Sequence, residues 1–183
     1  FHSDPADDPR GLGLSEIGYN FLGGLTANAT AYIGITAPTV NSYKRLVVGE
    51  PTSGSTWAPA YVTYGYNNRS MMLRIPDEGR IEDRTVDGSC NPYLAATAVL
   101  AAGLDGIERG LDPGGPTTEN MFKTTAAERE EMGIKTLPAN LLDATRELEK
   151  NDVMRKAFGS HDGRDYIDYF IERKRIEWTT FHE

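Results

Sequence analysis

The chain has 183 residues, of which 39% are hydrophobic and 25% are charged, and its formal net charge at pH 7 is -8. This length and composition predict one soluble globular domain with a substantial core. The negative charge excludes non-specific nucleic-acid binding, and no apolar run reaches the ~18 residues that a membrane span needs. A single cysteine, Cys90, excludes an internal disulfide framework and fits a reducing compartment such as the cytoplasm.

The two ends of the sequence are typical of a piece of a longer protein. The chain starts at Phe1, without an initiating Met, and stops at Glu183 inside a helical pattern. We therefore expect residues 1–183 to form a single partial domain.

A helix is predicted shortly after the start of the chain. Ser15 can cap it, and Ile17, Phe21 and Leu25 fall on one face. Each glycine within this helix costs about 1 kcal/mol relative to alanine, so close packing must compensate. These glycines are Gly18, Gly23 and Gly24.

A long loop and three short strands come next. Residues 38–59 contain many Pro, Gly, Ser and Thr residues and predict the loop. The strands are predicted over residues 61–66, 71–75 and 80–85, with turns between them.

The rest of the chain predicts helices. Asn91 followed by Pro92 starts one that runs to about Gly110, and its apolar composition predicts a central position. Residues 115–136 predict a surface loop with short helical turns, and apolar periodicity predicts two more helices, around residues 141–148 and 167–181. One block of strands flanked by helices indicates an α+β fold with an antiparallel sheet.

The predicted strands concentrate positive charge in an acidic chain. Four arginines occur within residues 69–84, namely Arg69, Arg74, Arg80 and Arg84. Because side chains alternate along a strand, Arg80, Glu82 and Arg84 project from one face. Guanidinium groups suit phosphate and carboxylate, and a carboxylate held between two of them can also bind a divalent cation. The spacing fits an anion site and equally a surface sheet with salt bridges worth about 0–1 kcal/mol each.

The order of short motifs along the chain helps to decide between an anion site and a surface sheet with salt bridges. Five motifs occur in order, and the ordered series strongly resembles the carboxy-terminal half of the glutamine synthetase catalytic domain, whose core is related to that of the guanidino kinases. The motifs are Asn41-Ser-Tyr-Lys-Arg45, Asn68-Arg-Ser70, Arg74-Ile-Pro76, Arg80-Ile-Glu-Asp-Arg84, and Asn91-Pro-Tyr93 followed by Ala102-Gly-Leu-Asp-Gly106.

The resemblance implies a reaction and its cofactors. Glutamine synthetases join glutamate and ammonia with ATP through a γ-glutamyl phosphate, at a site with Mg²⁺ or Mn²⁺. Their active sites lie at the boundaries between identical subunits in ring-shaped oligomers. The resemblance therefore implies ATP, a divalent metal, glutamate and an amine as ligands, and other copies of the same chain as partners.

The resemblance also implies a role for each arginine. Arg45 is similar to the arginine that binds the substrate glutamate, and Arg84 is similar to one that contacts the glutamate or the forming acyl phosphate. Arg69 and Arg74 resemble the arginines on the ATP phosphates and the transferring phosphoryl group, and Arg80 resembles a further nucleotide-phosphate contact.

Metal binding is implied for one residue only. Glu82 resembles the single metal-ligating glutamate of this region. The family draws its other ligands from residues upstream of this segment, and a neighbouring subunit completes the site. We therefore expect the 183-residue chain to be inactive by itself.

Two departures from the family pattern bear on function. Where ammonia-using members carry a glutamate that binds ammonium, this chain has Trp57-Ala-Pro59, with Glu50 seven residues earlier. Trp57 could favour an alkylammonium by cation–π contact, as in γ-glutamylmethylamide synthetases, or Glu50 could bind ammonium instead. Phe122 occupies the position comparable to the tyrosine adenylylated in some bacterial members, which predicts no such control there.

Three hypotheses therefore follow from the sequence. The first is a fragment of a glutamate–ammonia ligase, with a glutamate–alkylamine ligase as its close alternative. The second is a guanidino phosphotransferase, which the Asn-Pro-Tyr and Asn-Ser-Tyr-Lys-Arg motifs disfavour. The third is a non-catalytic domain that binds anions or nucleotides.

Overall fold

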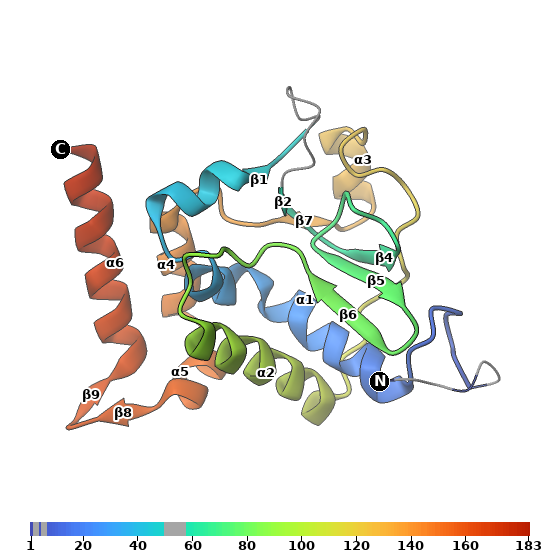
Figure 1. Ribbon diagram of the computed structural model, residues 1–183, viewed down its shortest axis with the longest axis horizontal. Coiled ribbons are helices and arrows are strands. Elements are labelled where there is room, and N and C mark those ends of the chain that lie inside the picture. Colours follow the sequence, from blue (N-terminus) through green and yellow to red (C-terminus); the bar gives the residue numbers. More distant parts are fainter. Residues whose placement is uncertain (2–3, 5–6, 50–57) are drawn as a thin grey trace.

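Two long helices that cross closely organise the fold: α1 (Glu16–Thr36) and α2 (Pro92–Arg109). Figure 1 shows a computed structural model, which describes residues 1, 4, 7–49 and 58–183. A small sheet lies beside α1 at one end of the molecule, and the carboxy-terminal helix lies at the opposite end (Figure 1). The mixture of helices and small sheets confirms the predicted α+β class.

Helix α1 begins where the sequence predicts. The hydroxyl of Ser15 accepts a hydrogen bond from the backbone N–H of Gly18 and so caps the helix. Phe21 and Leu25 are buried, but Ile17 is 57% exposed, so its placement on the buried face was wrong. Ile17 lies in the first turn of the helix, whereas Tyr19 and Leu22, in the same part of the helix, are buried in the core.

The glycines of α1 allow the two helices to touch backbone to backbone. A Cβ atom on Gly24 would lie 2.0 Å from the carbonyl oxygen of Ala102, and one on Gly106 would lie 2.1 Å from that of Asn20. Only a residue without a side chain fits at these contacts. The predicted compensation of helical glycines by close packing is confirmed at Gly24.

The predicted loop over residues 38–59 is partly wrong. A short 3₁₀ helix, η1 (Val40–Arg45), occupies its start, followed by strand β1 (Leu46–Val47). Thr39 and Ser42 form a reciprocal capping box that starts η1. The loop prediction weighed Pro and Gly content and overlooked this cap.

The strands form several small sheets. Strand β4 (Tyr64–Tyr66) pairs parallel with β5 (Leu73–Asp77), and β5 pairs antiparallel with β6 (Arg80–Asp83). The predicted antiparallel sheet is confirmed for β5 with β6, whereas β4 runs parallel to β5, because the segment between them leaves β4 and returns to run in the same direction. The remaining pairs are β1 with β2 (Ala58–Pro59), parallel, and β3 (Tyr61–Val62) with β7 (Lys135–Thr136), antiparallel.

Helix α2 has the predicted caps but not the predicted burial. The side chain of Asn91 accepts hydrogen bonds from two backbone N–H groups, and Gly110 ends the helix in the left-handed region at φ 59°. One side of α2 packs on α1, while its other side exposes Tyr93, Leu100 and Leu104. The expectation of a fully central helix was therefore wrong for these residues.

Short helices complete the fold: α3 (Ala126–Glu131), α4 (Leu141–Glu149), α5 (Asp152–Phe158) and the longer α6 (Tyr166–His182). A hairpin of β8 (Ser160–His161) and β9 (Arg164–Asp165) joins the last two. Helices α4 and α6 confirm the two predicted from periodicity, and α4 packs on both α1 and α6. Among the described residues, no helix combines the length and hydropathy that crossing a membrane requires.

Part of the predicted surface loop over residues 115–136 is buried. Met121 and Phe122 pack with Tyr61 and Met71 in a small cluster separate from the main core. The Phe122 ring meets the Tyr61 ring edge-on, with the centroids 6.1 Å apart. Phe122 is therefore a packing residue and only 9% exposed.

The helix crossing predicts an asymmetry between two glycine substitutions. Gly106→Ala forces a methyl group against the backbone of α1, so we expect a loss of stability of about 1–3 kcal/mol despite the higher helix propensity of alanine. Gly115→Ala is the matched control, because a Cβ there meets no atom within 4 Å, and its effect should stay within about 0.5 kcal/mol. Thermal unfolding midpoints measure both, and equal midpoints would contradict the close crossing.

Candidate functional site

Arg74 and Glu82 lie directly opposite each other on neighbouring strands. They are register partners of β5 and β6, and Nη1 of Arg74 lies 3.0 Å from Oε2 of Glu82. Asn67, the residue after β4, has a side-chain oxygen that accepts hydrogen bonds from Nε and Nη2 of Arg74. These two partners hold the guanidinium of Arg74 in one orientation over the sheet.

Arg84 reaches the same carboxylate from the next position on that face. Its Nε lies 3.5 Å from Oε1 of Glu82, as the period-two pattern predicts for residues two apart. Its Nη1 donates a 2.7 Å hydrogen bond to the backbone carbonyl of Arg69. Both carboxylate oxygens of Glu82 thus contact arginines, and we call Arg69, Arg74, Glu82 and Arg84 the arginine cluster.

The arginine cluster carries an excess of positive charge. Partial burial lowers the pKa of Arg84; the charge of Glu82 raises it, and the positive charges of Arg74 and Arg69 lower it again. Two guanidinium groups, those of Arg74 and Arg84, therefore share one carboxylate, and the charge of Arg69 is close enough to act on Arg84. An added anion relieves this repulsion, so the cluster is an anion-binding arrangement.

A groove beside the cluster offers space for such an anion. It has a volume of about 460 Å³ and is lined by the residues that follow β4 and by part of the 118–122 segment. Arg69 lines it and is itself exposed. A larger cavity of about 630 Å³ lies between α1, residues 111–119 and residues 132–135, and Lys135 is the one cation among its lining residues, so it does not adjoin the arginine cluster.

Arg80 stands apart from the cluster. It opens β6 opposite Asp77, beyond a register shift in β5, and its side chain is exposed. Within the part of the chain that the structure describes, Arg80 forms no ion pair under 4.0 Å. Arg80 at the start of β6 is therefore exposed to solvent and does not contact the carboxylate of Glu82.

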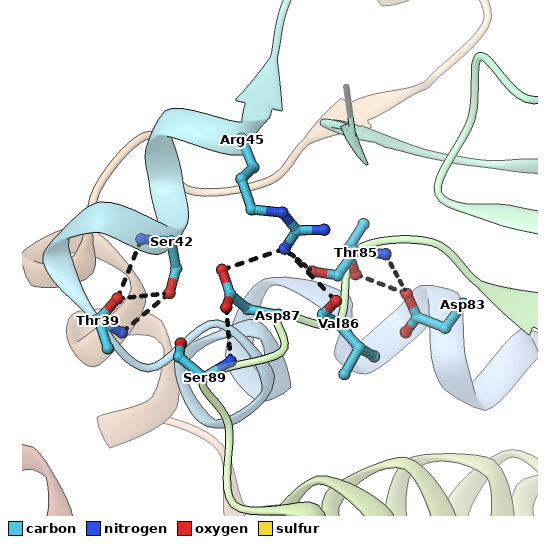
Figure 2. A network of polar contacts seen from close by, with 8 residues as sticks. All are labelled: Thr39, Ser42, Arg45, Asp83, Thr85, Val86, Asp87 and Ser89. Atoms are coloured by element: carbon cyan, nitrogen blue, oxygen red, sulfur yellow. Dashed lines mark hydrogen bonds and ion pairs between the residues drawn. The ribbon is translucent and has the colours of Figure 1, made fainter. Parts of the chain in front are cut away.

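Arg45 reaches the segment that follows β6 (Figure 2). Its Nη1 lies 3.2 Å from Oδ2 of Asp87 and 3.4 Å from the carbonyl oxygens of Thr85 and Val86. Burial raises the pKa of Asp87, but hydrogen bonds from Ser89 and the charge of Arg45 outweigh it and hold the pKa below its ordinary value. Arg45 therefore lies outside the arginine cluster and is tied to the chain just beyond it.

Glu50 and Trp57 lie outside the described residues, whereas the segments that flank them are described. Leu46 of β1 is paired with Ala58 of β2, so the two flanks lie side by side. The phenol oxygen of buried Tyr61 accepts a 2.6 Å hydrogen bond from the backbone N–H of Gly49.

The described residues do not form a metal site by themselves. Across 7–49 and 58–183, no three His, Cys, Asp or Glu side chains gather closely enough to hold an ion. Glu82 is the carboxylate of the cluster, and both of its oxygens contact arginines. Glu82 is therefore the one candidate metal ligand within the arginine cluster, and a bound Mg²⁺ or Mn²⁺ would need further ligands such as water, substrate phosphate or other side chains.

Two aspartates that were not predicted from the sequence organise the site. Asp83 and Asp87 each stand two residues before a hydroxyl residue, in Asp83-Arg-Thr85 and Asp87-Gly-Ser89, and each accepts the backbone N–H two residues on. This is the side-chain-to-backbone turn that Asp favours. The repeated Asp-x-Thr/Ser spacing was the available signal.

With this geometry in place, comparisons with known proteins are informative. The family described as "Glutamine synthetase, catalytic domain" matches residues 4–183. The chain belongs to the glutamine synthetase catalytic-domain family. The match bears out the resemblance carried by the five motifs, and it favours this family over the guanidino phosphotransferases.

Two kinds of relative are similarly close. A glutamate–methylamine ligase of Methyloversatilis universalis is 48% identical over 174 residues, covering 95% of this chain and 38% of the relative. A glutamine synthetase of Pyrococcus woesei is 45% identical over 175 residues, covering 93% and 37%. The chain thus spans less than two fifths of the length of these relatives.

Solved structures agree with these matches. A GmaS structure in complex with ADP superposes with a TM-score of 0.85 at 44% identity, covering 100% of this chain and 39% of that one. A ligand-free GmaS structure gives a TM-score of 0.80 at 41% identity, covering 100% and 38%. The fold described above is therefore the fold of this part of the glutamine synthetase catalytic domain.

The arginine cluster predicts a measurable anion affinity. Arg74→Gln removes one of three cations, so we expect binding of inorganic tripolyphosphate to the complete protein to weaken about tenfold or more, as for loss of a charged hydrogen bond. Arg109→Gln is the control. The Arg109 side chain is exposed at the end of α2, and among the described residues it forms an ion pair only with Asp105. Calorimetric titration compares the two, and equal affinities would show that the anion binds elsewhere.

Proposed function

We propose that this chain supplies the arginine-rich part of the active site of a ligase that joins an amine to the γ-carboxylate of glutamate at the expense of ATP. The observation that carries the proposal is the arginine cluster in a member of the glutamine synthetase family. In the first candidate the amine is ammonia, and in the second it is methylamine.

The chemistry explains the concentration of cations. The γ-carboxylate of glutamate attacks the terminal phosphorus of ATP, forming γ-glutamyl phosphate and releasing ADP. The amine then attacks the acyl carbon, forming the amide, losing a proton and releasing phosphate. The first step brings two anions together, and fixed guanidinium groups lower its barrier by offsetting their repulsion.

Three arginines are proposed to act on the nucleotide. Arg69 and Arg74 would bind the ATP phosphates and the transferring phosphoryl group, and Arg80 would bind a further phosphate. Three observations support this assignment: Arg69 lines the groove, Arg74 contacts Asn67 on the wall of the groove, and the side chain of Arg80 is exposed. The GmaS neighbour solved with ADP supports a nucleotide ligand.

Two arginines are proposed to act on glutamate. Arg45 would bind the substrate carboxylate, since Asp87 and two carbonyls contact only its Nη1 atom among the described atoms. Arg84 would contact the glutamate or the acyl phosphate, because it lies between the nucleotide arginines and the segment that holds Arg45. Each role extends a family resemblance to a residue at the matching position.

A divalent metal is part of the proposal. Mg²⁺ or Mn²⁺ would neutralise charge on the ATP phosphates, and Glu82 would be its one ligand from this chain. Because no three such side chains gather among the described residues, the further ligands would come from other parts of the complete protein. The relatives' greater length leaves room for such segments.

The remaining partners follow from family membership. We propose that the complete protein forms a ring of identical subunits in the cytoplasm, with active sites completed between neighbours. The isolated 183-residue chain would then lack groups that catalysis needs. Glu50 or Trp57 would contact the amine, according to which candidate holds.

The second candidate rests on a specific observation. The glutamate–methylamine ligase is 48% identical to this chain and the glutamine synthetase 45%, and the two solved structures named above are of GmaS, a glutamate–methylamine ligase. A non-catalytic anion-binding domain is the remaining alternative. The two ligases differ in the amide that they form, and the binding domain forms no product.

The decisive assay supplies the complete protein with glutamate, ATP and Mg²⁺ and compares ammonia, methylamine and ethylamine. We expect amine-dependent release of phosphate together with the matching γ-glutamyl amide, identified by mass spectrometry. A kcat/KM advantage of about a hundredfold for methylamine would establish the second candidate, since a single added methyl group contributes about tenfold or more in a fitted pocket. No amide with any amine would contradict the ligase proposal and favour the binding domain.

A further inference from the structure

The carboxylate of Asp83 lies on the opposite face of β6 from the arginine cluster. Asp83 stands between Glu82 and Arg84 in the sequence, so strand alternation turns it toward helix α1. The hydroxyl of Tyr32 on α1 donates a 2.8 Å hydrogen bond to Oδ2 of Asp83. The proposed catalytic machinery uses neither residue.

Both oxygens of this carboxylate have partners. Thr85 donates to Oδ1 from its backbone N–H at 2.9 Å and from its hydroxyl at 2.6 Å (Figure 2). Tyr32 and Thr85 are both fully buried. A carboxylate that is bonded at both oxygens by buried partners has one orientation, so the backbone that carries it is restrained as well.

The electrostatic setting is consistent with this arrangement. Burial raises the pKa of Asp83, and the hydrogen bonds from Thr85 and Tyr32 oppose the increase. Burial and the charge of Asp83 also raise the pKa of Tyr32 well above its ordinary value, so the phenol keeps the proton that it donates. Burial of a carboxylate such as that of Asp83 costs free energy unless its oxygens are hydrogen-bonded, so the partners that orient it are part of the site.

Helix α1 also contacts the segment that follows β6 at a second point. The carbonyl of Thr36, one turn after Tyr32, accepts a 2.9 Å hydrogen bond from the backbone N–H of Asp87. Between these two anchors, the carbonyls of Thr85 and Val86 accept hydrogen bonds from Arg45 (Figure 2). Helix α1 thus fixes the position of residues 83–87. This segment carries Arg84 and also contains the two carbonyl groups that accept hydrogen bonds from Arg45.

We propose that Asp83 is a positioning residue, which Tyr32 and Thr85 fix so that its neighbours Glu82 and Arg84 project correctly into the active site. The inference rests on the proposed ligase function and deepens it. Catalysis is sensitive to small displacements, since a shift of about 1 Å in a reacting group can cost about a hundredfold in rate. The effect should fall on kcat, because these neighbours act on the transferring group.

The test uses two tyrosines of the same helix. Tyr32→Phe removes the hydroxyl that holds Asp83, and Tyr19→Phe removes a buried hydroxyl that donates to Asp8 at 2.7 Å, away from the arginine cluster. In the complete protein we expect both to lower the unfolding midpoint to a similar extent. Tyr32→Phe alone should lower kcat about tenfold or more, with Tyr19→Phe within about twofold of the wild type.

A second pair keeps the inference testable if Tyr32→Phe fails to fold. Thr85→Ala removes the hydroxyl that lies 2.6 Å from Asp83 and should lower kcat. Thr85→Ser retains a hydroxyl at this position, so its kcat should be close to that of the wild type. An active wild type with equal kcat in Tyr32→Phe and Tyr19→Phe, or in Thr85→Ala and Thr85→Ser, would overturn the positioning role alone. An inactive wild type would overturn the ligase proposal and this inference with it.

Discussion

The backbone contact between α1 and α2 is the constraint on which the rest of this structure depends. Gly24 and Gly106 let the helices approach until each backbone touches the other, which sets the position of α1. The far end of α1 then carries Tyr32 and Thr36, which bind the segment after β6. Packing at glycines far from the arginines therefore determines where Arg84 and the partners of Arg45 lie.

The arginine cluster, which these contacts position, depends on electrostatic interactions. An acidic protein places two guanidinium groups on one carboxylate and a third positive charge, that of Arg69, nearby, an arrangement that a bound anion stabilises. Glu82 keeps the cluster from being purely repulsive and orients Arg74 and Arg84 at once. Its single charge leaves a net attraction for phosphate, which fits the family to which the chain belongs.

The sequence predicted local features well and long-range ones less well. The caps at Ser15 and Asn91 and the shared face of Glu82 and Arg84 depend on nearby residues, and each was found. The parallel pairing of β4 with β5 and the exposed side of α2 depend on distant packing, which periodicity does not report. The placement of Arg45 on Asp87, rather than in the cluster, required the fold to bring η1 to the end of β6.

The most direct test of this account is a crystal structure of the complete protein with glutamate and a non-hydrolysable ATP analogue. We predict phosphate oxygens within about 3.2 Å of the guanidinium groups of Arg69 and Arg74, and the glutamate carboxylates near Arg45 and Arg84. Phosphates bound elsewhere, with the contacts of Glu82 to both arginines undisturbed and the groove beside Arg69 vacant, would contradict the claim that this cluster is the anion site.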